Sequence, residues 1–232
     1  MFSPSVFHIS VNIVLHAMFW WCIQLCITPV FFENCVPVYT HLSIAKQKEW
    51  NIKATVMLFS LYSVFFSCIA LLTNEQVYHQ DLYVNTPYTQ FLMDSFAGHF
   101  LWDLMICIAY FDVWGYPFII HGLFCSMMYM TLAYSHLGVA FGLRVIFYEC
   151  SNVFMNTRAF MKDLKMFDSP LWNVVNIGFA ISFISVRLLY GSYLTICIVC
   201  AVWYSNVPMW FKYSVYINSV LSYGLNMYWG KL

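Results

Sequence analysis

The sequence predicts an all-α, polytopic membrane protein, and two observations carry this prediction. Of 232 residues, 62% are hydrophobic and only 9% are charged, whereas soluble domains carry about 25% charged residues. The apolar residues also fall into stretches of about 20 residues, the length of a helix that crosses a bilayer. The chain has room for about seven such spans with short loops. Its formal net charge of zero gives no electrostatic reason to expect nucleic acid as a partner.

The spans follow one another along the chain as runs of apolar residues. The first, 11–32, is too long for the core of a signal peptide, so we expect it to be retained. The others are predicted at 54–72, 91–110, 118–134, 136–155, 171–190 and 209–229.

Two segments between these spans need a separate interpretation. Residues 156–170 carry charges, with apolar side chains recurring at helical spacing, which predicts an amphipathic helix at the membrane surface. Residues 193–204 are apolar. They either continue the sixth span beyond Gly191, a common kink residue, or form a span of their own.

The basic residues predict the orientation of the chain. With seven spans, only Lys212 falls on one side of the membrane, while Arg144 and Arg187 count as within spans. Lys and Arg are enriched in cytosolic loops, so we expect a lumenal N-terminus and a cytosolic C-terminus. The residues on the other, cytosolic side are Lys46, Lys48, Lys53, Arg158, Lys162, Lys165 and Lys231.

Several ionisable residues lie inside the predicted spans. A charge at a helix centre costs about 2.5–3.5 kcal/mol on insertion scales, so each one needs a partner or a function. His99 and Asp103 are four residues apart and therefore share a helix face. One interpretation is mutual neutralisation, of His99 by Asp103 and of Arg144 by Glu149.

The other interpretation is a chemical site. His121 follows a short turn that brings it back beside the third span, where Asp103 could orient it as a general base. An interhelical hydrogen bond explains the same pair equally well. We expect Arg187, near the lumenal end of its span, to extend its side chain toward the interface. The single CxxC motif, at 197–200, lacks the second pair of ligands that zinc needs, so we predict no metal site.

Six short motifs occur in a fixed order after the first span. They are EWN at 49–51, GHFLWDL at 98–104, FIIH at 118–121, YECS at 148–151 with NTR at 156–158, VR at 186–187, and LNMYW at 225–229. In this order they resemble the TLC domain family, which includes ceramide synthases and translocating-chain-associated membrane proteins. The chain is most similar to the small TLC domain-containing proteins of that family.

The resemblance implies a six-helix barrel (46–232) after an N-terminal segment with an extra helix (1–45). It also implies an elongated cavity suited to an acyl chain, and residence in the endoplasmic reticulum or a related endomembrane, with a homodimer left open. The expected polar wall of the cavity comprises His99, Asp103, His121, Arg144 and Glu149. The family pattern adds Ser151, Asn156, Arg158, Arg187, Asn226 and Trp229.

The chain departs from the ceramide synthases at the positions that matter for catalysis. Their adjacent histidine pair is reduced here to His121, followed by Gly122, and their two aspartates are replaced by Glu149 and Asn152. Acyl transfer needs a base and groups that stabilise developing charge. We therefore expect a non-enzymatic or weakly enzymatic protein of membrane lipid homeostasis that binds or moves a lipid or acyl chain without a cofactor.

Two alternatives remain from the sequence. The first is an acyl-CoA-dependent sphingoid-base N-acyltransferase that keeps His121 as its base and takes acyl-CoA as co-substrate. The second is a scaffold or chaperone for other membrane proteins, an activity found in some members of the family. An open interior would favour a lipid ligand, and a solidly packed one would favour the scaffold.

Overall fold

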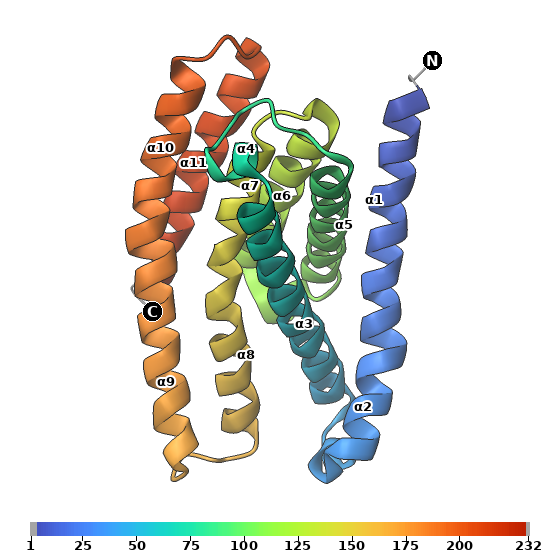
Figure 1. Cartoon of the computed structure of the whole chain (residues 1–232). Coiled ribbons are helices and arrows are strands. Elements are labelled where there is room, and N and C mark those ends of the chain that lie inside the picture. The colour runs from blue at the N-terminus through green and yellow to red at the C-terminus, as the bar shows by residue number, and fades with distance from the viewer. Residues whose placement is uncertain (1–3, 231–232) are drawn as a thin grey trace.

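The computed structural model describes residues 4–230, and every regular element within that range is a helix. Figure 1 shows long helices that run side by side along one direction. Five of them are long and apolar enough to cross a membrane, which confirms the prediction of an all-α polytopic protein and is consistent with about seven spans. These five are Val6–Cys35, Ile44–Thr73, Pro87–Ala109, Phe111–Ser135 and Pro170–Trp203.

The N-terminal half contributes the first four of these candidate spans. The first is continuous through α1 (Pro4–Cys22), the π-helical η1 (Ile23–Ile27) and α2 (Thr28–Cys35), and is followed by the short η2 (Pro37–His41). Next come α3 (Ile44–Thr73), α4 (Glu75–Tyr78), α5 (Pro87–Ala109) and α6 (Phe111–Ser135).

The turn predicted before His121 is present and runs through Tyr110 and Gly115. Only Tyr110 separates the end of α5 from the start of α6, and α6 then breaks once, at Gly115. The φ of Gly115 is 70°, in the left-handed region that favours glycine. Pro117 follows in the resumed helix. The third and fourth spans therefore pack as neighbours.

The C-terminal half of the structure shows how residues 156–170 and 193–204 fold. The run α7 (Val139–Val145), η3 (Ile146–Glu149) and α8 (Cys150–Asp163) is continuous, so the separate surface helix predicted over 156–170 is wrong. Residues 193–204 are not a separate span either. They continue α9 (Pro170–Ser182) and the π-helical η4 (Phe183–Tyr190) as part of α10 (Gly191–Trp203), and α11 (Met209–Trp229) follows.

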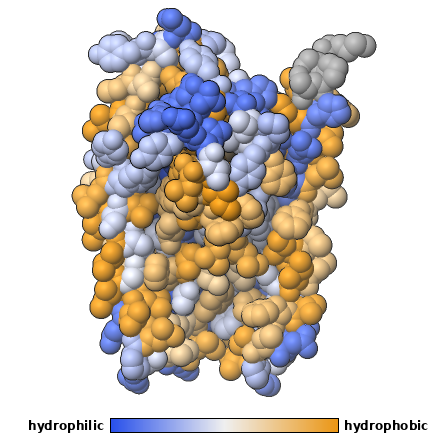
Figure 2. Space-filling model, in the orientation of Figure 1, coloured by the Kyte–Doolittle hydropathy of each residue, from blue (hydrophilic) through white to orange (hydrophobic). Residues whose placement is uncertain are grey.

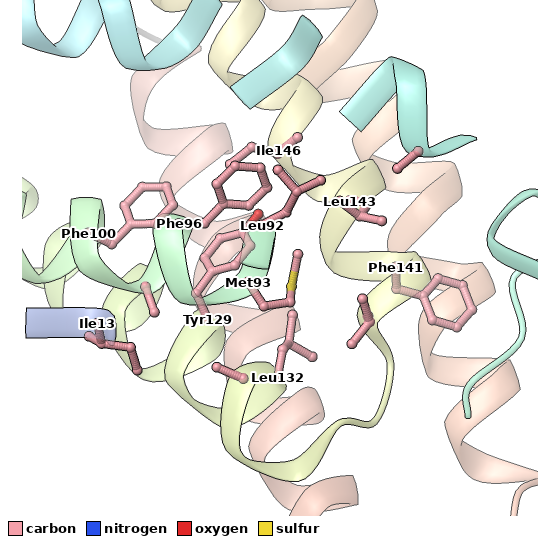
Figure 3. Close-up of a cluster of buried hydrophobic side chains, with 14 of the residues drawn as sticks. Ile13, Leu92, Met93, Phe96, Phe100, Tyr129, Leu132, Phe141, Leu143 and Ile146 are labelled. Carbon is pink, nitrogen blue, oxygen red and sulfur yellow. The ribbon is translucent and has the colours of Figure 1, made fainter. Parts of the chain in front are cut away.

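The surface and the interior both fit a membrane protein. Figure 2 shows hydrophobic side chains over the middle of the molecule and hydrophilic ones gathered toward its two ends. The core centres on α5, from which Leu92, Met93 and Phe96 point toward Tyr129 of α6 and Leu143 of α7 (Figure 3). All five are buried. An apolar exterior around an apolar core is expected where lipid replaces water as the solvent.

The end of the bundle that carries the starts of α3 and α9 holds most of the basic residues, and we call it the basic end. Here Trp50 Nε1 of α3 donates a hydrogen bond to Asp163 Oδ2 of α8, at 2.9 Å. Lys46 Nζ lies 3.1 Å from Asp163 Oδ1. Phe160 belongs to the segment predicted as a surface helix, and its ring packs on the ring of Trp50. These contacts explain why α8 continues through 156–163: its apolar side packs on α3 rather than on a membrane surface.

Candidate functional site

A cavity of about 320 Å³ lies inside the bundle, and we call it the main cavity. Helices α3, α5, α6, α8, α9 and α11, together with η3 and η4, contribute to its wall. The wall combines aromatic side chains with an unusual number of polar ones for the interior of a membrane protein. The polar residues that line it are Lys53, His99, Asp103, His121, Glu149, Ser151, Asn152, Asn156, Arg158 and Arg187.

Arg187 is the hub of the polar lining. Its Nε donates to Ser151 Oγ at 2.9 Å, its Nη2 to Asn152 Oδ1 at 3.1 Å, and its Nη1 to Asn226 Oδ1 at 3.5 Å. Its guanidinium also lies over the ring of Trp229, 5.8 Å from the centroid. Only 6% of Arg187 is exposed, so the prediction that it reaches the membrane interface is wrong. Its helix face points into the bundle, where partners from α8 and α11 replace water.

Glu149 takes part in the same network. Its Oε2 accepts hydrogen bonds from Asn152 Nδ2 at 2.6 Å and from Ser60 Oγ at 3.4 Å. Arg187 Nη2 lies 4.0 Å from Glu149 Oε1, a loose buried ion pair. The predicted neutralisation of Glu149 by Arg144 is therefore wrong, and Arg187 takes that place.

Arg144 has a different role from the one predicted. Its guanidinium donates to the backbone carbonyl oxygens of Val77 at 2.8 Å, Tyr78 at 2.6 Å and Ala140 at 2.9 Å. Arg144 is not among the residues that line the main cavity. It ties α4 to α7, far from the basic end, and gives the Tyr78 carbonyl, at the end of a short helix, a hydrogen-bond donor.

His99 is buried among aromatic rings. Its ring stacks on Phe59 with 3.4 Å between centroids, and Trp20 meets its edge. Among residues 4–230, no hydrogen bond joins His99 to Asp103, so the predicted pair does not form, although both line the main cavity. The Nδ1 atom of His99 has no hydrogen-bond partner among the described residues.

His121 lines the main cavity, and among residues 4–230 no carboxylate forms a hydrogen bond that would orient its ring. The Sγ atom of Cys125 lies 3.6 Å from its Nδ1 and 3.7 Å from its Nε2, and the ring of Trp229 meets its edge at 5.3 Å. Within the described part of the chain, no hydrogen bond connects His121 to Asp103 or Glu149. The geometry positions His121 as a wall residue and shows no proton relay.

Two residues of the lining each carry a nitrogen atom without a hydrogen-bond partner among the described residues. Asn156 is 3% exposed and His99 is 2% exposed, and both Asn156 Nδ2 and His99 Nδ1 lack a partner within the described residues. Buried polar atoms are rarely left without a hydrogen bond, because each one costs about 1–3 kcal/mol. No group of His, Cys, Asp and Glu suited to a metal ion occurs between residues 4 and 230.

The motif residues from distant parts of the chain meet at this cavity. Ser151, Asn156, Arg158, Arg187 and Trp229 all line it, and Asn226 binds Arg187 from the far side. The sequence interpretation did not assign Asn152 or Lys53 to the site. Asn152 could have been found from its spacing, because a residue three positions after Glu149 lies on the same helix face.

The fold and the site together define a multi-pass helical membrane protein with a polar-lined cavity inside its bundle. A sequence model of the TLC domain matches residues 49–232. The chain therefore belongs to the TLC domain family, which confirms the resemblance seen in its motifs.

Three curated relatives illustrate the similarity. TLC domain-containing protein 4 A of Dictyostelium discoideum is 26% identical over 153 residues, which cover 64% of this chain and 59% of that protein. An uncharacterized TLC domain-containing protein of Schizosaccharomyces pombe is 23% identical over 221 residues, 94% of this chain and 74% of that protein. Topoisomerase I damage affected protein 4 of Saccharomyces cerevisiae is 30% identical over 170 residues, 69% of this chain and 60% of that protein.

Proposed function

We propose that this protein binds a membrane lipid by its polar headgroup in the main cavity and acts in membrane lipid homeostasis. The observation that carries the proposal is the polar lining of a cavity of about 320 Å³, in which His99 and Asn156 each carry a nitrogen atom without a partner among the described residues. The aromatic side chains around them suit an apolar chain. We also propose that the protein resides in an endomembrane such as the endoplasmic reticulum, with its basic end facing the cytosol. It would act there as a monomer or a homodimer.

Mass spectrometry of lipids that remain with the purified protein tests this proposal. We expect the native protein to retain a specific lipid class above the proportion of that class in the membrane. Asn156→Ala should reduce this retention about tenfold, as expected for the loss of one hydrogen bond to a charged group of the lipid headgroup. The Asp103→Asn variant should change which lipid class is retained, because it replaces a carboxyl group of the wall with an amide.

A matched control is available on α9. Asn176 is a partly buried asparagine whose side chain donates to the carbonyl oxygen of Trp172 in its own helix, and it does not line the main cavity. Asn176→Ala should leave lipid retention unchanged. Retention of bulk phospholipid alone, with the same composition in native protein and in Asn156→Ala, would contradict the proposal.

A second candidate function is the acyl-CoA-dependent N-acylation of a sphingoid base. The observation that favours it is a pair of cations, Lys53 and Arg158, in the wall of the main cavity toward the basic end. Such cations suit the phosphate groups of a bound acyl-CoA. The candidate predicts that native protein incubated with sphingoid base and acyl-CoA forms an amide, and that His121→Ala forms none. Absence of product from the native protein would remove this candidate.

The third possibility, a scaffold or chaperone for membrane proteins, receives less support. It was expected to have a solidly packed interior, whereas this bundle encloses the main cavity. The lipid-binding proposal uses that cavity, and the scaffold would not.

A further inference from the structure

Two smaller cavities continue the main cavity away from the basic end. The second, of about 50 Å³, shares Phe100, His121, Glu149, Arg187 and Trp229 with the main cavity. The third, of about 70 Å³, shares Met128, Val145, Tyr148, Asn218 and Ser222 with the second. The third cavity also reaches Leu82 and Gly138, which lie in the loops before α5 and after α6. The three cavities therefore form a series from one end of the bundle toward the other.

One wall of this series is a polar line on α11. Ser214, Asn218, Ser222 and Asn226 are spaced four residues apart, so they lie on one face of the helix. The first three line the smaller cavities, and Asn226 lines the second cavity and binds Arg187. Polar residues inside membrane spans are costly and usually face a cavity with a function. They also lower the hydropathy of α11, which is not among the five helices that are apolar enough to be identified as candidate spans.

The polar line on α11, extended by the polar residues of α8, has the length of a membrane crossing. From Ser214 to Asn226 the rise is about 18 Å, at about 1.5 Å per residue. Arg187 joins Asn226 to Asn152 on α8, and the rise from Asn152 to Arg158 adds about 9 Å. The sum, about 27 Å, compares with about 30 Å for the hydrocarbon core of a bilayer. The unpartnered Nδ2 of Asn156 lies within the second part of this line.

The charges on the line indicate which polar species it suits. Its centre holds one cation, Arg187, and one anion, Glu149, whose closest nitrogen and oxygen atoms are 4.0 Å apart. A zwitterionic headgroup carries the complementary charges: its phosphate suits Arg187 and its ammonium group suits Glu149. A small cation would meet the unfavourable field of Arg187. The opposite wall, with Leu82, Val145 and other apolar residues, suits an acyl chain better than an ion.

We propose that this line is a route by which the headgroups of zwitterionic glycerophospholipids cross between the two leaflets, so that the protein equilibrates lipid across its membrane. The inference rests on the proposed lipid binding and goes beyond it, from holding a lipid to moving it. A headgroup exceeds the smaller cavities, so α11 must move outward as it passes. Within the described chain, Phe211 and Asn226 are the only buried residues of α11, which fits a movable wall.

Transbilayer movement can be measured on native protein in phosphatidylcholine vesicles that contain a trace of fluorescently labelled phosphatidylcholine. Dithionite added outside quenches only the outer-leaflet label in protein-free vesicles. We expect the native protein to expose the inner-leaflet label as well. In vesicles loaded with a trapped soluble dye, that dye should stay fluorescent after dithionite is added, which excludes a simple leak.

The polar line is tested by N218L combined with S222V. These substitutions remove two polar groups from the middle of the route, and we expect the rate of lipid movement to fall about tenfold. The matched control combines N176L with S192V. Asn176 and Ser192 also bond to carbonyl oxygens of their own helix but line none of the three cavities, so the control should move lipid at the native rate.

The outcomes separate this inference from the proposed function. Native protein that retains a specific lipid but leaves the inner-leaflet label protected would overturn the route and leave lipid binding intact. Native protein that neither retains nor moves lipid would overturn both. Equal rates for the N218L/S222V protein and its control would exclude the line on α11 as the route. Size-exclusion chromatography of both variants confirms that a loss of movement is not a loss of fold.

Discussion

Arg187→Leu is expected to destabilise the protein by about 3–5 kcal/mol, the usual cost of breaking a buried ion pair by removing one partner. The substitution leaves Glu149, which is 4% exposed, as an uncompensated buried charge. It also removes the donors that Ser151, Asn152 and Asn226 accept from, and so separates α8 from α11. The free energy of unfolding in mixed detergent micelles, measured by titration with a denaturing detergent, checks this expectation.

The double variant R187L/E149Q provides the control. Glutamine keeps an oxygen for the hydrogen bond from Asn152 Nδ2 and carries no charge. We expect it to recover at least half of the lost stability, because the larger part of the cost is the unpaired carboxylate rather than the missing guanidinium. A double variant less stable than R187L would show that the two side chains do not compensate each other.

Gly98→Leu is expected to separate α1 from α5. A Cβ atom at position 98 would lie 2.5 Å from the Cβ of His16 and 2.7 Å from the backbone oxygen of Ile13. Since backbone atoms cannot move aside as a flexible side chain can, the two helices must part. We expect a loss of about 1–3 kcal/mol, the usual cost of overpacking, together with faster proteolysis in α1, measured by limited digestion in micelles.

Gly224 offers the matched control for this substitution. A Cβ atom at Gly224 meets no other atom within 4 Å. Gly224→Leu should therefore leave the digestion pattern unchanged and should not lower stability, because leucine also favours a helix more than glycine does. Equal losses at 98 and 224 would mean that the cost arises from the added apolar side chain in detergent and not from close packing.

The class of fold could be predicted because it depends on composition and on the length of apolar runs, which the sequence displays directly. The helix boundaries depend on packing as well. Residues 156–163 read as a surface helix because their charges alternate with apolar residues, yet Phe160 packs on Trp50 and draws the segment into α8. Local patterns could not show that partner, since Trp50 lies more than a hundred positions earlier.

The site was predictable in part for a similar reason. His99, Asp103, His121 and Glu149 stood out because ionisable residues are rare inside spans, and all four line the main cavity. Their partners did not stand out, because pairing depends on which helices become neighbours. Proximity in the sequence favoured Arg144 for Glu149, whereas the structure provides Arg187.

Gly122 is another position whose role depends on which helices become neighbours. The sequence interpretation treated it as the position of a missing second histidine. A Cβ atom there would lie 3.0 Å from the Cα of Leu104 on α5, so position 122 is a point of close helix contact. Restoring a histidine there would push α5 and α6 apart before it could add a functional group to the main cavity.

The π-helical segment η4 (Phe183–Tyr190) has a consequence for the evolution of this protein. A π-helical segment differs from an α-helix by an inserted residue within a continuous helix, and each residue of an α-helix turns the chain by about 100°. The wide turn absorbs that extra residue, so deleting one residue near Arg187 would restore regular winding while the face of α10 still meets α11. Within α9 or α10 the same deletion would rotate everything that follows by that angle. Single-residue deletions should therefore be tolerated better in η4 than in the helices on either side of it.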